Sequence, residues 1–319
     1  ESIPGYRADL TEAEFKAQLK RIGAVLTGQT VDLAPADRKL YALRDVTATV
    51  STPPLIVSSI ISKKIAASTD AILLDVKVGK GAFMKTLEQA NLLAKAMVRL
   101  ATQAGQRAMA LIGDMNQPLG HAVGNAVEVK EAIDALHGGG PHDLREHCLT
   151  VAAEMLVLGQ RAPDSQAGLE IACDALDSGR AWHKFKAMVE AQGGDVSTVE
   201  EPEKLPRADL IERVAAPQDG YLAEVDAVEI GMTVVELGGG REKKGAPIDH
   251  SVGVVVHHKV GDRVTEGAPL FTIHASDEES YRKARQRVLA AHHFSAEPVE
   301  PLPLFYDRVT ADSIADKAA

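Results

Sequence analysis

The sequence predicts an α/β fold: a mostly parallel sheet with flanking helices, an inserted helical-lobe segment and a β-rich C-terminal domain of the barrel-sandwich kind. Apolar runs of strand length alternate with segments of helical periodicity up to residue 206, which indicates a parallel sheet. Beyond residue 206, short β-type runs are separated by glycine turns. The 319 residues, 45% apolar and 25% charged, are enough for two or three ordinary globular domains.

Composition excludes several classes of function. The formal net charge is −10 and no basic stripe with interleaved aromatic residues occurs, so we expect no nucleic-acid partner. No apolar run approaches the roughly 18–20 residues of a membrane span, so we expect no membrane partner. Cys148 and Cys173 stand alone in helix-like segments. We expect both to be buried and reduced, which is typical of a cytoplasmic protein.

The chain begins with a helix whose start is clearly marked. Thr11 and Glu14 form a capping box, and the helix that follows stops at Gly23. The next segment, Ala24–Thr27, is predicted to be a short strand of the sheet, and Ala36–Leu43 is predicted to be a helix.

The middle of the chain alternates helices with two apolar strands. Pro54 suits the first turn of a helix, because its missing N–H has no intrahelical partner there. The helices are predicted at about residues 55–67, 86–104, 125–137, 143–158, 164–177 and 180–192, and the strands at 71–76 and 108–112. Residues 113–124 are predicted to form a loop.

The last third of the chain has β character. It contains the runs GYLAEV, VGVVVHHKVGDRV and PLFTIHA, then a helix at about residues 278–291 and a proline-rich tail. We therefore predict three units: an α/β domain of residues 1–36 and 70–206, a helical-lobe segment of residues 37–69, and a C-terminal α+β domain of residues 213–319.

The helix at residues 55–67 carries polar groups in an apolar setting. Ile56, Ser59 and Lys63 are three and four residues apart, so they share one helical face. Lys63 is either a ligand-binding cation or a surface lysine that keeps its charge in water, as we expect of Lys64. Upstream, Arg44 is either a ligand clamp or the partner of Asp45 in a local ion pair, and Tyr41 by itself indicates packing.

Two further places are candidates for ligand binding. Asp75-Val76-Lys77 ends an apolar strand, where ligands bind in open α/β sheets, and the glycine-containing loop up to Phe83 allows close backbone approach. That loop matches neither a P-loop nor a dinucleotide fingerprint. Glu131, one helical turn beyond Glu128, either faces solvent or reaches back to a cation near residues 113–124, where backbone carbonyls would suit an ion with oxygen ligands.

The order of these segments resembles one family, pyrimidine nucleoside phosphorylase with its sibling thymidine phosphorylase. The matching segments are ESIPGY, LAPADRKLYALRDVTATV, SSIISKK, DVKVGKGAFM, DMNQPLG, GNAVEVKEAI, GGGREKK, IDHSVGV and KVGDRV. They span essentially the whole chain. The resemblance implies cleavage of pyrimidine nucleosides such as uridine, thymidine and deoxyuridine by inorganic phosphate, which yields the free base and a pentose 1-phosphate.

The resemblance also implies roles for particular residues. Arg44 and Lys63 match the family's base-binding cations and are the expected catalytic residues; Tyr41, Ile56, Ser59 and Phe83 match residues around the base. The carbonyls of Leu119 and Ala122 and the carboxylate of Glu131 match part of a potassium site. No organic cofactor is expected, phosphate is the co-substrate, and the family forms homodimers whose lobes close over the substrates.

One departure from the family is large. Its phosphate site lies in a Lys-His-Ser-Thr-Gly-Gly loop and a glycine-rich segment upstream of the ESIPG motif, with which this chain begins. We therefore expect an N-terminal part of the family to be lacking, no phosphate-binding residues in this chain, and no phosphorylase activity from the chain alone.

Three alternatives remain open. The first is a phosphorylase restricted to thymidine. The second is a carrier module, because the C-terminal β runs resemble biotinyl domains and Lys243-Lys244 lies in a glycine-rich turn, although flanking methionines are missing. The third is a non-catalytic fragment that serves folding or assembly.

Overall fold

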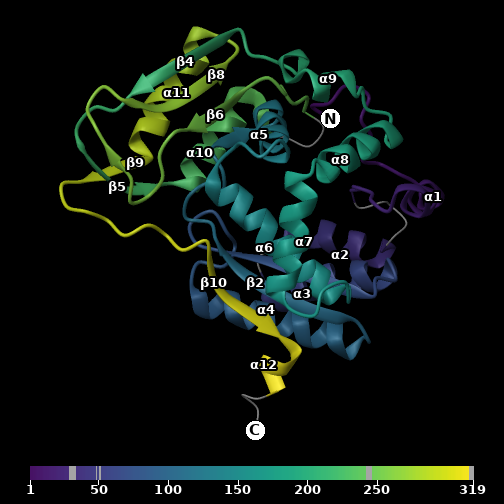
Figure 1. Cartoon of the computed structure of the whole chain (residues 1–319). Coiled ribbons are helices and arrows are strands. Elements are labelled where there is room, and N and C mark those ends of the chain that lie inside the picture. Colours follow the sequence, from purple (N-terminus) through teal and green to yellow (C-terminus); the bar gives the residue numbers. More distant parts are fainter. Residues whose placement is uncertain (29–33, 48, 50–51, 242–245, 316–319) are drawn as a thin grey trace.

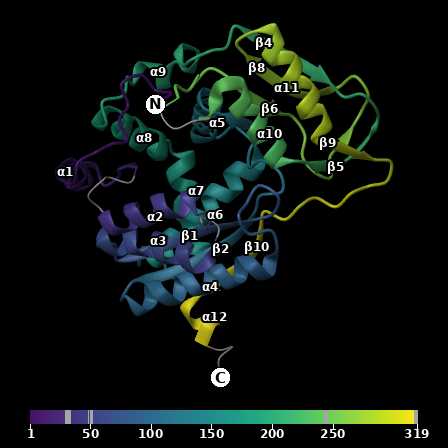
Figure 2. The ribbon, with the colours of Figure 1, turned by 180° about the vertical axis from the view of Figure 1, so that it is seen from behind.

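The computed structural model describes residues 1–28, 34–47, 49, 52–241 and 246–315, except for the side chains of residues 38, 42, 45 and 315. Figure 1 shows a small sheet with helices around it in the lower half and a β-rich module above, with α6 (His142–Leu158) and α7 (Ser165–Asp177) between them. The rear view gives the same arrangement, with α2 (Pro35–Val46) and α3 (Pro53–Ala66) beside the lower sheet (Figure 2). Among the described residues, no helix combines the length and the apolar character that crossing a membrane requires.

The lower sheet has the strand order β1-β2-β10. Strand β1 (Ala71–Val78) runs parallel to β2 (Arg107–Asp114). Strand β10 (Phe305–Thr310), from the end of the chain, is antiparallel to β2. The predicted α/β class is confirmed, and the described part of this sheet has one parallel and one antiparallel pairing rather than a longer parallel series.

Side chains alternate between the two faces of β1, so each face meets a different layer. One face is buried in the apolar core that includes Ile61, which is fully buried, and residues of the helix α4. The other face carries Asp75 and Lys77 toward α6, where both approach His147. The helices α4 (Leu87–Gln103), α6 (His142–Leu158) and α12 (Ala311–Ala315) contact the strands of this sheet, and α3 (Pro53–Ala66) packs on α4 and adds to the same core.

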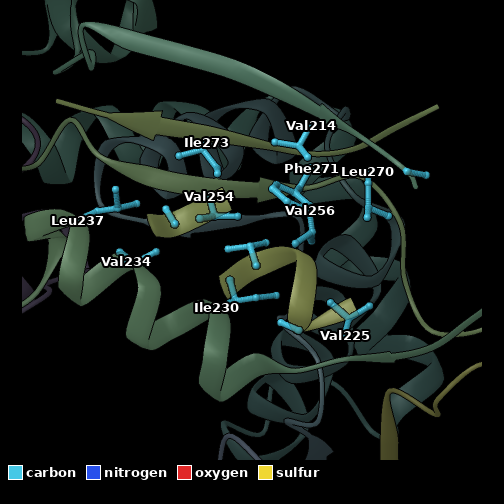
Figure 3. Packing of buried hydrophobic residues seen from close by; sticks show 14 of the residues in the cluster. Val214, Val225, Ile230, Val234, Leu237, Val254, Val256, Leu270, Phe271 and Ile273 are labelled. Atoms are coloured by element: carbon cyan, nitrogen blue, oxygen red, sulfur yellow. The ribbon is translucent and has the colours of Figure 1, made fainter. Parts of the chain in front are cut away.

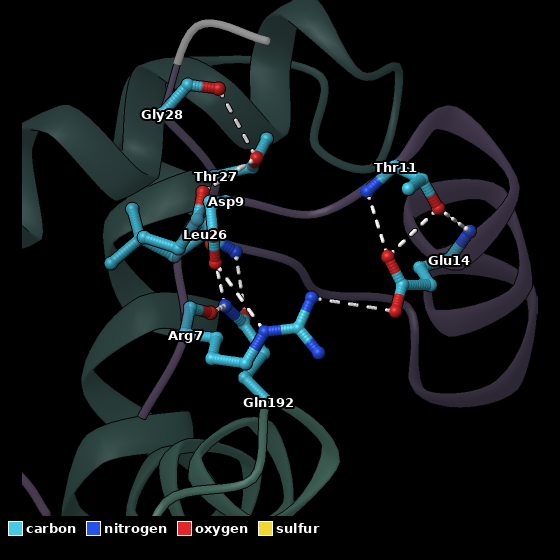
Figure 4. Close-up of polar contacts among 9 residues, drawn as sticks. Arg7, Asp9, Thr11, Glu14, Leu26, Thr27, Gly28 and Gln192 are labelled. Carbon is cyan, nitrogen blue, oxygen red and sulfur yellow. Dashed lines mark hydrogen bonds and ion pairs between the residues drawn. The ribbon is translucent and has the colours of Figure 1, made fainter. Parts of the chain in front are cut away.

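The N-terminal segment starts as predicted and then departs from the prediction. Thr11 and Glu14 form the capping box of α1 (Glu12–Ile22), and Gly23 ends the helix in the left-handed conformation. The prediction of a strand at 24–27 is wrong, because the backbone there forms hydrogen bonds with a side chain rather than with a neighbouring strand. The Gln192 amide donates to the carbonyls of Leu26 and Arg7, at 2.7 Å each (Figure 4).

The upper module consists of two antiparallel sheets. Their strand orders are β3-β6-β8-β4 and β7-β5-β9. The strands are β3 (Ala122–Gly124), β4 (Leu210–Ala215), β5 (Gly220–Val225), β6 (Gly253–Val256), β7 (Arg263–Val264), β8 (Pro269–Ala275) and β9 (His292–Ser295). Strand β3 forms the end of the predicted 113–124 loop, which attaches that loop to the module.

The core of the module lies between its sheets and two helices. Phe271 on β8 is fully buried among valine, leucine and isoleucine side chains (Figure 3). The helices are α10 (Ala227–Val234), which continues into a π-helical turn (Val235–Gly239), and α11 (Glu278–Ala290). Apolar strand residues facing apolar helix residues give the module a core of its own.

The remaining helices pack on the elements already described or on one another. Gly168 of α7 allows close packing on α6, because a Cβ there would lie 2.6 Å from the Ala153 carbonyl oxygen. Cys148 on α6 is exposed, so the prediction that it is buried is wrong. These helices are α2 (Pro35–Val46), α5 (Ala126–Leu136), α7 (Ser165–Asp177), α8 (Arg180–Ala191), α9 (Ser197–Glu200) and the 3-10 helix Pro202–Lys204.

The division into three units stays a prediction. The structure shows that β10, within the unit assigned to residues 213–319, pairs with β2 of the lower sheet. The end of the chain thus returns to the α/β part after the upper module is complete.

Candidate active site

The side chains of Asp37, Ser59 and Lys63 meet between α2 and α3. The Lys63 ammonium lies 3.1 Å from Asp37 Oδ2 and donates to Ser59 Oγ at 3.2 Å. Ser59 Oγ in turn donates to Asp37 Oδ2 at 3.0 Å. Ser59 is buried and Lys63 is partly exposed, with 23% of its side chain accessible. The helix therefore places Ser59 and Lys63 together, as their spacing predicts, and fixes the ammonium at the edge of the protein.

Tyr41 and Arg44 lie beside this group on α2. The centre of the Tyr41 ring is 5.1 Å from Arg44 Cζ and 5.9 Å from Lys63 Nζ, within the range of cation–π attraction. Tyr41 keeps 44% of its surface exposed, whereas Arg44 is buried. Arg44 donates to the carbonyl oxygens of Leu55 at 3.0 Å and Thr49 at 3.4 Å, so it also connects Thr49 to the first turn of α3.

The other residues predicted around the base are placed differently. Ile56 is half-buried and packs against the core of the lower sheet. Phe83 lies on the turn after β1 and is 66% exposed, and it makes no ring contact with Tyr41 or Lys63. The possible ion pair of Arg44 with Asp45 involves a side chain outside the described part of the chain.

This arrangement suits a flat, polar ring that can carry negative charge. Lysine has three donors, and the Lys63 ammonium uses two of them on Asp37 and Ser59. The third is left for a ligand, so far as the described residues show. An exposed aromatic ring offers a surface for stacking, and two fixed cations beside it favour carbonyl oxygens on which charge develops.

A second group surrounds Glu131 on α5. Its Oε1 accepts from the backbone N–H groups of His121 at 2.8 Å and Ala122 at 2.9 Å. Gly120 has φ +68°, and a Cβ there would lie 2.3 Å from Glu131 Oε2, so the carboxylate needs a glycine at this position. Burial raises the pKa of Glu131, while the N–H groups of His121 and Ala122, and then the Lys259 ammonium, oppose that rise.

The residues predicted to bind potassium lie in one place. Leu119 and Ala122 flank Gly120 on the loop that Glu131 contacts. Carbonyl and carboxylate oxygens are a suitable donor set for a cation with oxygen ligands. However, a positive charge is already present, because Lys259 donates to the carbonyl of Gly120.

The strand-end residues Asp75 and Lys77 are paired with each other. Asp75 Oδ2 lies 2.9 Å from Lys77 Nζ and 2.8 Å from His147 Nε2. Burial opposes ionisation of Asp75, but these hydrogen bonds outweigh it and hold its pKa below the ordinary value. His147 is buried and stacks on Phe305 of β10 at 4.8 Å. The group therefore links the lower sheet, α6 and the end of the chain.

Comparisons with known proteins agree with this architecture. Residues 1–182 match the model of the glycosyl transferase family a/b domain, and residues 221–295 match that of the pyrimidine nucleoside phosphorylase C-terminal domain. The chain is 46% identical over 310 residues to the pyrimidine-nucleoside phosphorylase of Geobacillus stearothermophilus. The chain belongs to the pyrimidine nucleoside phosphorylase family.

Further phosphorylases of this family are similarly close. The one from Staphylococcus haemolyticus is 50% identical over 278 residues, and one from Staphylococcus epidermidis is 48% identical over 279 residues. The alignment with the Geobacillus protein covers 97% of this chain and 71% of that relative. The alignments with the two Staphylococcus proteins cover 87% and 88% of this chain and 64% of each relative. The chain therefore spans about two thirds of the length of these relatives.

Sequence reasoning missed three residues at these sites. Asp37 lies four residues before Tyr41 and seven before Arg44, so helical spacing could have placed it on their face. Lys259 and His147 gave no such signal, because each reaches its partners across elements that are distant in the sequence. Lys243 and Lys244, on which the carrier alternative depends, lie outside the described residues.

Proposed function

We propose that this chain forms the base-recognition part of an enzyme that cleaves pyrimidine nucleosides with inorganic phosphate. The products are the free base and ribose or deoxyribose 1-phosphate, and uridine, thymidine and deoxyuridine are the substrates. The observation that carries the proposal is the Lys63 ammonium, fixed by Asp37 and Ser59 beside the exposed Tyr41 ring, in a chain of this family.

The chemistry of the reaction explains why a fixed cation belongs there. When the bond between base and sugar breaks, negative charge develops on the pyrimidine, over its carbonyl oxygens and ring nitrogen. A cation held in place beside those atoms stabilises the charge without having to reorganise. Lys63 provides that charge, while Arg44 sits beside the same aromatic ring. Ser59 and Asp37 act as positioning residues that hold the ammonium.

The remaining parts of the proposal concern the complete protein. Phosphate is the co-substrate, and none of the phosphate-binding motifs of the family occurs in this sequence. The carbonyls of Leu119 and Ala122 and the Glu131 carboxylate would hold potassium, and the complete protein would be a cytoplasmic homodimer. Titrating potassium against thermal stability tests the ion site, and sedimentation tests the dimer.

The central test separates recognition of the base from turnover. We expect the 319-residue chain to bind uracil and uridine weakly and to show no phosphorolysis with added phosphate. Binding is measured by ligand-observed NMR with adenine as the control, because a purine does not present the pyrimidine carbonyl pattern. Normal turnover by this chain, or equal binding of adenine and uracil, would refute the proposal.

Substrate range is a separate expectation. Uridine and thymidine should both be cleaved by the complete protein, at rates within about tenfold of each other, because the groups proposed to bind substrate would contact the base and not the sugar. The measurement is kcat/KM for the two nucleosides. Cleavage of thymidine alone would favour the thymidine-restricted alternative.

A further inference from the structure

Lys259 connects the upper module to the loop of residues 117–122. It follows strand β6 in the sequence, and its ammonium donates to the carbonyl oxygens of Pro118, at 2.5 Å, and of Gly120. It also lies 3.0 Å from Asp143 Oδ2 on α6. Lysine has three donors and no acceptor, so these three oxygens account for all of them.

The surroundings of the ammonium are built by several elements. Only 15% of the Lys259 side chain is exposed. The backbone beside it is fixed, since Val260 N–H donates to Gln117 Oε1 at 2.9 Å. The carboxylate of Asp143 is fixed as well, because Gly120 N–H donates to its Oδ2 at 3.2 Å.

These oxygens need a positive charge between them. Two carbonyl dipoles and a carboxylate that converge on one point repel one another, and a buried charge without a partner is strongly destabilising. Burial lowers the pKa of Lys259, while Asp143 and Glu131 oppose that effect. A free monovalent cation could also bind among these oxygens, because their partial and full negative charges would attract it.

We propose that the Lys259 ammonium is a built-in monovalent cation, which holds the 117–122 loop in the way that a free potassium or ammonium ion would. Removing the amine then creates a site for such an ion, formed by the Pro118 and Gly120 carbonyls and the Asp143 carboxylate.

The test compares the wild type with Lys259→Ala in about 0.2 M choline, lithium, ammonium or potassium chloride, a concentration that fills weak sites. In choline, Lys259→Ala should lower the Tm by about 5 °C, because it leaves the Asp143 carboxylate without its positively charged partner. Ammonium or potassium should restore most of that loss, and lithium should not. In the wild type, the difference in Tm between potassium and choline should be clearly smaller than in Lys259→Ala.

Two control variants separate an ion site from a general salt effect. Lys259→Met keeps an unbranched stem that fills the cage, so it should lose stability without specific recovery in potassium or ammonium. Lys80→Ala removes an ammonium that pairs with the Glu224 carboxylate, not with backbone carbonyls, and should show no recovery specific to an ion.

The inference is overturned if potassium and ammonium raise the Tm of Lys259→Ala no more than lithium does. It is also overturned if they raise it no more than they raise the Tm of the wild type, of Lys259→Met or of Lys80→Ala. Should Lys259→Ala fail to fold in choline, the yield of folded protein after dilution from urea is compared in the same four salts. Equal yields would then overturn the inference. No nucleoside or turnover enters these measurements, so their outcome is independent of the proposed base recognition and phosphorolysis.

Discussion

Replacing Lys63 with methionine should lower kcat for phosphorolysis by about 10²–10³-fold in a protein that joins this chain to the phosphate-binding part of the family. Methionine keeps an unbranched, apolar stem but removes the ammonium that Asp37 and Ser59 hold in place. The loss should fall mainly on kcat, because the charge on the base develops as the bond breaks. The measurement is steady-state kinetics with uridine at saturating phosphate.

The adjacent lysine offers a matched control. Lys64 lies next to Lys63 on α3 but is exposed, so Lys64→Met should change the rate less than about twofold. A similar loss in both variants would show that the charge of this helix as a whole matters, and not the position of Lys63. An unchanged rate in Lys63→Met would remove Lys63 from the reaction.

Replacing Phe271 with alanine should destabilise the upper module by about 3–5 kcal/mol, because it leaves a large cavity. Phe271 is fully buried on β8, between the sheets and the helices α10 and α11 (Figure 3). Hydrogen exchange should therefore accelerate in β6 and β8, whose backbones pair with each other. Urea unfolding gives the loss of stability, and exchange followed by mass spectrometry locates it.

The matched control for this prediction is Phe83→Ala. Phe83 is 66% exposed, so the same substitution should change stability by no more than about 0.5 kcal/mol. Equal effects of the two substitutions, or exchange that accelerates only in the lower sheet, would contradict the assignment of Phe271 to the core of the module.

The local signals in the sequence were sufficient for most helices. Thr11 and Glu14 cap α1 as predicted, since a capping box involves only neighbouring residues. The strand predicted at 24–27 was wrong for the opposite reason. Its apolar residues satisfy the local rule, but the partner of its backbone is the side chain of Gln192, which is distant in the sequence.

The same contrast holds for the candidate sites. Spacing on one helix was enough to pair Ser59 with Lys63, because helical geometry is local. Spacing could not show that Lys259 would reach the Gly120 carbonyl, since that contact depends on how the upper module packs on the 117–122 loop.

The sequence by itself determined the α/β class, most of the helices and the shared face of Ser59 and Lys63, all of which follow from short-range periodicity. Only the tertiary structure decided that β10 joins the lower sheet, that Asp37 holds the Lys63 ammonium, and that Lys259 lies among the oxygens of the loop. Those contacts join segments that periodicity treats as independent, and packing selects them by burial and charge pairing.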